Sequence, residues 1–142
     1  MKEDINALDE IHKGACMGQD ALAFVMDKVE DDALKKELER EYKLYDEIAN
    51  EIDDIYSKYD KGEPHTTSTM NKAMTWSGIE MKTMNDKSNS KIAELLLNGV
   101  NMGIIEGKKI LNNKKLNKEV SIIVSKYVNM QEENVEKLKT FL

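Results

Sequence analysis

Apolar residues recur at alternating spacings of three and four along most of the chain, which is the periodicity of helices that bury one face. Two such stripes occupy the first part of the sequence, at residues 5–29 and 34–59. Two more occupy the last part, at residues 92–110 and 116–141. No segment shows the sustained two-residue alternation of a strand. The pattern therefore predicts an all-α protein with four long helices.

Short polar turns predict how these helices are connected. "EDD" at 30–32 is brief enough to fold the first two helices into an antiparallel hairpin, with Asp31 or Asp32 as the N-cap of the second. "NNKKLN" at 112–117 turns the chain between the last two helices in the same way. "DKSNS" at 86–90 offers Ser88 or Ser90 as the cap of the helix that follows.

A shorter segment separates the two hairpins. In "KGEPHTTST" at 61–69, Gly62 and Pro64 end the preceding helix. A short stripe follows, which predicts a helix at 68–86 that carries the chain back along the outside of the bundle. Four methionines lie on one face of this helix, which favours flexible core filling over a binding surface: Met70, Met74, Met81 and Met84. We expect residues 1–142 to form one domain.

Glycines recur every four residues in two of the predicted helices. Gly99, Gly103 and Gly107 lie on one face, and Gly14 and Gly18 repeat the spacing in the first helix. Each glycine in a helix interior costs about 1 kcal/mol relative to alanine, so the pattern needs a structural reason. We expect the two helices to cross closely at these faces, as in GxxxG pairs. The alternative is that the glycines clear space for a ligand between helices.

The charge and composition exclude some functions. Charged residues make up 34% of the chain and the net charge is −6, which disfavours binding to a phosphate backbone and suggests surface ion pairs. No run approaches the roughly 20 apolar residues of a membrane-spanning helix. The single cysteine, Cys16, excludes an intrachain disulfide and favours a cytoplasmic location. We interpret Cys16 as a buried apolar side chain.

Metal ligands would be the commonest chemistry of a helical bundle, but the set is incomplete. A di-iron site needs a Glu on two helices and Glu-x-x-His on the other two. The chain has two histidines: His65 lies in the turn after Pro64, and His12 follows Asp9 at the required spacing. No nucleophilic constellation can be assembled, because no partner for His12 can be placed. We therefore predict no metal, no cofactor and no enzyme activity. The weak metal candidates are Glu41, Glu106 and His12.

The layout of the chain resembles a family of ferritin-like bundles. The resemblance covers about residues 3–142 and depends on "KVEDDALKKELEREYKLYDEI" at 28–48, on "GEP" at 62–64, and on a short helix in place of ferritin's long crossover. The family is a bacterial four-helix-bundle family of unknown function. The resemblance implies a ferritin-like four-helix bundle of two antiparallel hairpins joined by a shorter crossover helix.

The sequence departs from the iron-binding members of the ferritin-like group. Those proteins carry inward carboxylates near the middle of their helices, where this chain has amides, which are poor iron ligands. We expect these amides either to hydrogen-bond across the bundle or to face solvent: Gln19, Asn98 or Asn101, and Gln131 or Asn134.

These observations favour a non-catalytic binding or structural module. It is expected to form a homo-oligomer or to bind a protein partner, for example through the methionine-lined helix, and to bind neither nucleic acid nor membrane. One alternative is a protein that binds iron or manganese at a reduced carboxylate site. Another is a protein that holds a small apolar ligand between its helices.

Overall fold

The computed structural model describes residues 2–59 and 85–142, which form four long helices and, within these two ranges, no strand. The helices are α1 (Lys2–Met26), α2 (Asp32–Tyr56), α5 (Asn89–Asn113) and α6 (Lys118–Lys139). The predicted all-α class with four long helices is confirmed. The methionine-lined helix predicted at 68–86, together with Gly62, Pro64 and His65, lies almost wholly outside the described residues.

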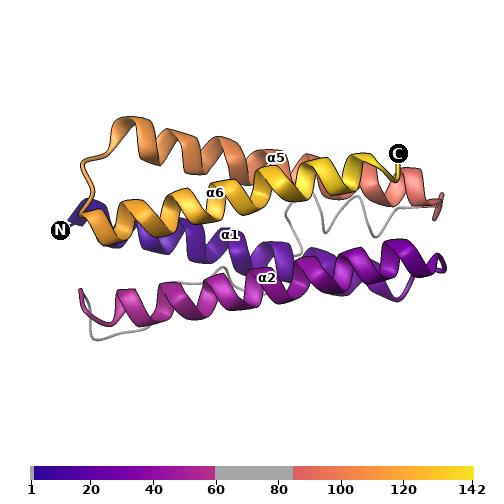
Figure 1. Ribbon diagram of the computed structural model, residues 1–142, viewed down its shortest axis with the longest axis horizontal. Helices are drawn as coiled ribbons and strands as arrows, with labels where there is room; N and C mark the ends of the chain where they lie inside the picture. Colours follow the sequence, from indigo (N-terminus) through magenta and orange to yellow (C-terminus); the bar gives the residue numbers. More distant parts are fainter. Residues whose placement is uncertain (1, 60–84) are drawn as a thin grey trace.

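The four helices lie roughly along one axis and pack as two neighbouring pairs (Figure 1). Chain neighbours α1 and α2 run antiparallel and contact each other along their length, as do α5 and α6. The pairs meet where α1 packs against α5 and α6, and where α2 packs against α6. No described helix combines the length and apolarity that crossing a membrane would require.

Two of the helices begin at side-chain caps that the sequence predicted among alternatives. Asp31 Oδ1 accepts a hydrogen bond from the Leu34 amide at 2.8 Å at the start of α2. Ser88 Oγ accepts from the Lys91 amide at 3.2 Å at the start of α5. Each cap satisfies an amide that the helix itself leaves unpaired.

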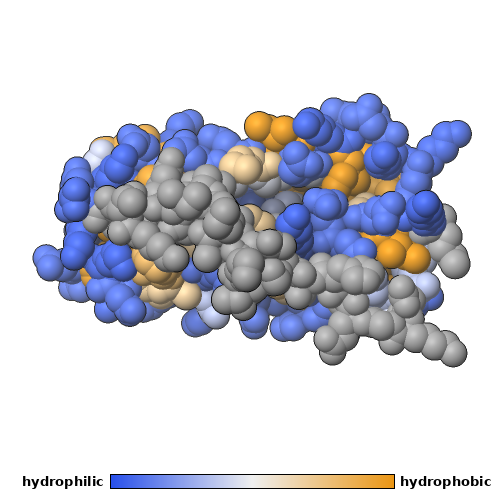
Figure 2. All heavy atoms as spheres, turned by 180° about the vertical axis from the view of Figure 1, so that it is seen from behind, coloured by the Kyte–Doolittle hydropathy of each residue, from blue (hydrophilic) through white to orange (hydrophobic). Residues whose placement is uncertain are grey.

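The core is formed by the apolar stripes of all four helices. Leu8, Leu38, Ile92 and Val124 represent the four helices in it, and each is fully buried. Charged side chains occupy the outer surfaces, and Figure 2 shows apolar patches on the visible face separated by hydrophilic residues. Two ion pairs connect α6 to α2 and to the turn after it: Lys126–Glu51 at 2.7 Å, and Lys58–Glu119 at 2.6 Å, in which Lys58 follows the end of α2.

Candidate functional site

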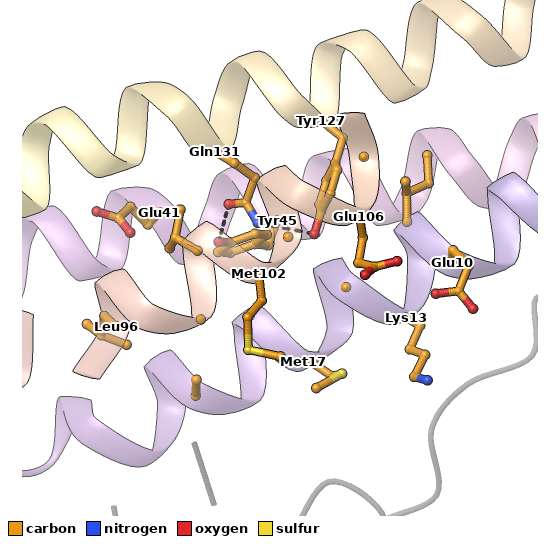
Figure 3. Close-up of a pocket in the computed structure, with 18 of the residues that line it drawn as sticks. Glu10, Lys13, Met17, Glu41, Tyr45, Leu96, Met102, Glu106, Tyr127 and Gln131 are labelled. Atoms are coloured by element: carbon orange, nitrogen blue, oxygen red, sulfur yellow. Dashed lines mark hydrogen bonds between the residues drawn. The ribbon is translucent and has the colours of Figure 1, made fainter. Parts of the chain in front are cut away.

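A cavity of about 430 Å³ lies between α1 and α5. This volume is within the range of small-molecule sites in proteins. Figure 3 shows Glu41 and Leu96 at one end, Glu10, Lys13 and Glu106 at the other, and Met17 and Met102 between them. The remaining wall residues are Ile11, Gly14, Gly18, Ala21, Leu22, Gly99, Val100, Gly103, Gly107, Ile110, Tyr45, Tyr127 and Gln131.

The repeated glycines belong to this cavity and make room for side chains of the opposite helices. A Cβ on Gly14 would overlap the Tyr127 hydroxyl, and one on Gly18 would lie 2.7 Å from the Tyr45 ring. A Cβ on Gly103 would lie 2.6 Å from Gln131 Nε2 and 2.9 Å from Tyr127 Oη.

The expectation that these glycines bring two backbones together is therefore wrong. Helices α1 and α5 do pack against each other, but the atoms nearest to four of the glycines are side chains of α2 and α6; these four are Gly14, Gly18, Gly103 and Gly107. All five predicted glycines line the cavity, as the alternative interpretation required.

A chain of hydrogen bonds crosses the cavity floor from α2 to α6. Tyr45 Oη donates to Gln131 Oε1 at 2.5 Å, and Gln131 Nε2 donates to Tyr127 Oη at 3.1 Å (Figure 3). Among the described residues no group accepts the hydrogen of the Tyr127 hydroxyl, so this O–H can donate to a molecule in the cavity. Burial raises the pKa of Tyr45 and raises the pKa of Tyr127 to about 12, so both phenols are neutral at pH 7.

A buried acidic group closes one end of the cavity. Glu41 is 1% exposed, and burial, followed by the hydrogen bond and charge of Glu37, raises its pKa to about 10. Burial disfavours the Glu37 anion as well, but hydrogen bonds from Arg40 and Glu41 outweigh it and lower the Glu37 pKa. Arg40 holds Glu37 through two hydrogen bonds of 3.0 and 2.7 Å and donates to Asn134 Oδ1 at 3.1 Å. Glu41 is therefore a neutral acid at pH 7 and donates a hydrogen bond to the Glu37 carboxylate.

The three metal candidates from the sequence do not converge. Glu41 and Glu106 lie at opposite ends of the cavity, and exposed Glu106 pairs with Lys109 at 3.8 Å. His12 does not line the cavity. Within residues 2–59 and 85–142 no three His, Cys, Asp or Glu side chains are arranged to hold a metal ion.

His12 has the orienting partner that sequence reasoning missed. Its Nε2 lies 3.1 Å from Asp53 Oδ1 on α2, and its Nδ1 lies 3.7 Å from Cys16 Sγ. The expectation that Cys16 is a buried apolar side chain is wrong, since Cys16 is only half-buried and its thiol lies against a polar nitrogen of His12. The antiparallel register of α1 and α2 is the signal that relates His12 to Asp53. Gln19, seven residues after His12, contacts Asp46, seven residues before Asp53, so the same register places His12 opposite Asp53.

The central amides divide between core and surface. Gln131 and Asn134 are buried and hydrogen-bonded across the bundle, as one of the two expectations required. Gln19 donates to Asp46 at 3.3 Å near the surface, and Asn98 and Asn101 are exposed.

Comparison with known proteins gives a fold and no family. No protein-family model and no curated protein matches the chain. Among solved structures, the bundle is similar to "CopM in the Cu(II)-bound form", with a TM-score of 0.76 and 12% sequence identity. The match covers 97% of this chain and 94% of that one. The two proteins share the arrangement of their helices, and the identity is too low to extend the likeness beyond the fold.

Proposed function

We propose that this protein is a non-catalytic binding module of ferritin-like architecture that holds an uncharged, mainly apolar small molecule between α1 and α5. The cavity supports this proposal, because its lining is mainly apolar and the glycines on both helices make room for the side chains that form its floor. The ferritin-like placement is supported by the two antiparallel helix pairs together with the sequence layout.

The lining defines the chemistry of the proposed ligand. Aliphatic side chains favour an apolar body, and the flexible thioethers of Met17 and Met102 can adapt to its shape. The floor is neutral, and the Tyr127 hydroxyl supplies one donor for a carbonyl or ether oxygen. At the charged end, Lys13 is accompanied by Glu10 and Glu106, so a cation there does not favour an anionic ligand.

Binding of Nile red, an uncharged apolar dye with one carbonyl group, tests this proposal. We expect its fluorescence to rise on binding, because the cavity removes it from water. Tyr127→Phe deletes the donor and should weaken the affinity about fivefold, the equivalent of one ordinary hydrogen bond. Tyr56→Phe is the matched control, since Tyr56 is equally buried but does not line the cavity.

The proposal fails if the dye gives no signal, or if both tyrosine variants bind it as the parent protein does. Native mass spectrometry of freshly purified protein adds an independent test. A retained small molecule that is lost on cavity substitution would support the proposal and identify the compound.

A metal-binding role is the second candidate. The solved structure with a similar fold is of CopM in a Cu(II)-bound form, and the sequence offers Glu41, Glu106 and His12 as candidates for a reduced iron or manganese site. Elemental analysis of protein purified without chelator decides this alternative. Less than about a tenth of an equivalent of copper, iron or manganese would exclude it, since a resident metal ion occupies most molecules.

Self-association is a further part of the proposal, with the cytoplasm as the proposed setting because the chain has a single cysteine. Several large apolar side chains on α5 and α6 are exposed, including Met102, Ile105 and Ile122. Burial of such side chains between copies would release water from apolar surface. Light scattering at high micromolar concentration measures this directly, and a monomer would exclude it.

A further inference from the structure

Three side chains with complementary chemistry lie in line between α1 and α2. Cys16 and His12 are one helical turn apart on α1, and Cys16 Sγ is 3.7 Å from His12 Nδ1. On the other side of the imidazole ring, Nε2 is 3.1 Å from Asp53 Oδ1. The His12 side chain is 8% exposed, so both of its nitrogens are directed at protein groups. None of the three residues lines the cavity.

Asp53 fixes the state in which His12 meets the thiol. A carboxylate facing Nε2 favours the tautomer with its proton on Nε2, which leaves the lone pair of Nδ1 directed at Cys16. A thiol with a base oriented by a third group is the arrangement that activates cysteine nucleophiles. We infer that Cys16 is a modification site, at which His12 accepts the thiol proton and the sulfur forms a mixed disulfide with a low-molecular-weight disulfide.

The exchange needs no reactant other than the Cys16 thiol and the low-molecular-weight disulfide. The proton moves from Cys16 Sγ to His12 Nδ1, and Asp53 stabilises the imidazolium. The thiolate attacks one sulfur of the disulfide, so that the new S–S bond forms as the old one breaks. The departing thiolate takes up a proton from His12 or from water. Cys16 is oxidised in this step, and the departing sulfur is reduced.

The carboxylates around Cys16 allow two roles of Asp53 to be distinguished, because the two roles predict opposite changes in the reaction rate. Asp9 and Asp20 lie on the same stripe of α1, and Asp46 lies on the facing side of α2. If these carboxylates acted on the sulfur only through their charge, removing any of them would favour the thiolate and speed the reaction. If Asp53 instead orients the base, its removal slows the reaction.

The measurement is the rate of reaction with dithiodipyridine, an uncharged disulfide, followed from pH 5 to 10. The chain has one cysteine, so the released thiol reports Cys16 alone, and Cys16→Ser is the blank. We expect the midpoint of the profile to lie at least one pH unit lower in the parent than in His12→Gln. A midpoint lower by one pH unit makes the thiol about tenfold more ionised at pH 6, and lower nucleophilicity reverses about threefold of this gain. His12→Gln should thus react about threefold more slowly at pH 6.

Asp53→Asn should slow the reaction in the same direction, whereas Asp46→Asn, the matched loss of one charge, should leave it unchanged or faster. Circular dichroism and thermal melting check that each variant is folded, and Asp53 is exposed enough that its variant decides the question if His12→Gln fails to fold. Three results would overturn the inference: Asp53→Asn reacting as fast as the parent, a parent midpoint at the ordinary thiol value, or no reaction in the folded protein.

Discussion

The carboxyl group of Glu41 has consequences at the scale of a single residue because it is neutral in the folded protein. Its pKa is raised to about 10 by burial first and by Glu37 second. In the unfolded chain the same group ionises near its ordinary value of 4.5. Above that pH the unfolded state binds fewer protons than the folded state, so stability falls as the pH rises towards 10. The pKa of Glu37 is lowered instead, and this affects stability in a separate pH range. The stability that ionised Glu37 contributes is lost only as the pH falls below its ordinary pKa of 4.5.

Glu41→Gln should remove this dependence on pH. The amide is neutral at every pH and similar in size, so the variant should gain stability over the parent between pH 5 and 9. The difference grows with pH by at most about 1.4 kcal/mol per unit, which is the limit for one proton. Urea unfolding at a series of pH values measures it. Glu47→Gln, an exposed change on the same helix, is the control and should follow the parent. Parallel curves for the parent and Glu41→Gln would contradict a neutral Glu41.

Sequence periodicity predicted the burial of single residues only where the whole helical face was apolar. Gln131 and Asn134 lie at the edge of their stripe, and the pattern left open whether they face the core or water. What decides their position is the set of polar groups on other helices that meet them, namely Tyr45 and Arg40. Such partners come from residues more than 80 positions away, so one helix does not reveal them.

At the scale of elements, the helices and their caps could be predicted because their signals are local. A 3.6-residue period and an Asp or Ser before the first turn are complete within a short stretch of sequence. The hydrogen bonds that hold one helix to a turn far along the chain have no such local signal. Asp4 Oδ1 accepts from the Asn117 amide and Glu3 Oε2 from the Lys115 amide, both at 2.8 Å, so the start of α1 holds the turn between α5 and α6.

Asp4→Ala should therefore destabilise the protein more than Glu3→Ala. Asp4 is 2% exposed, and losing its carboxylate leaves the Asn117 amide without its acceptor, which costs about 1–3 kcal/mol. Glu3 is exposed, and water can replace its oxygen, so we expect a change within about 0.5 kcal/mol. Urea unfolding of the two variants gives the comparison, and Asp4→Asn, which keeps an oxygen at this position, should recover part of the loss. Equal losses of stability in the two alanine variants would contradict the conclusion that Asp4 holds the turn between α5 and α6.

At the scale of the whole molecule, the cavity depends on all four helices and appears in none of them separately. The glycines on α1 and α5 predicted an unusual face, but whether backbone, side chain or empty space opposes that face depends on residues of α2 and α6. Tyr45 and Tyr127 reach the glycines without filling the volume between the helices. The sequence therefore predicted which faces of the bundle are unusual. Only the packing of all four helices determined that these faces line a cavity.

Two buried alanines of α1 and α2 test whether that volume is available. Ala21 is 9% exposed and lines the cavity, whereas Ala49 is 8% exposed and does not. Ala21→Leu adds three carbon atoms that the cavity has room for, and each buried CH₂ contributes about 0.8 kcal/mol, so the ligand-free protein should become up to about 2 kcal/mol more stable. Ala49→Leu places the same atoms in a filled interface and should cost about 1–3 kcal/mol.

The two variants should rank in opposite order for dye affinity and for stability. Ala21→Leu occupies part of the proposed binding volume and should weaken Nile red binding while it raises the melting temperature. Ala49→Leu should leave affinity near that of the parent at temperatures where it is folded, because it does not reach the cavity. Thermal melting and dye titration on the same samples separate these effects. If Ala21→Leu stabilised the protein and bound the dye unchanged, the volume between α1 and α5 would be a packing defect and the ligand would have to bind elsewhere.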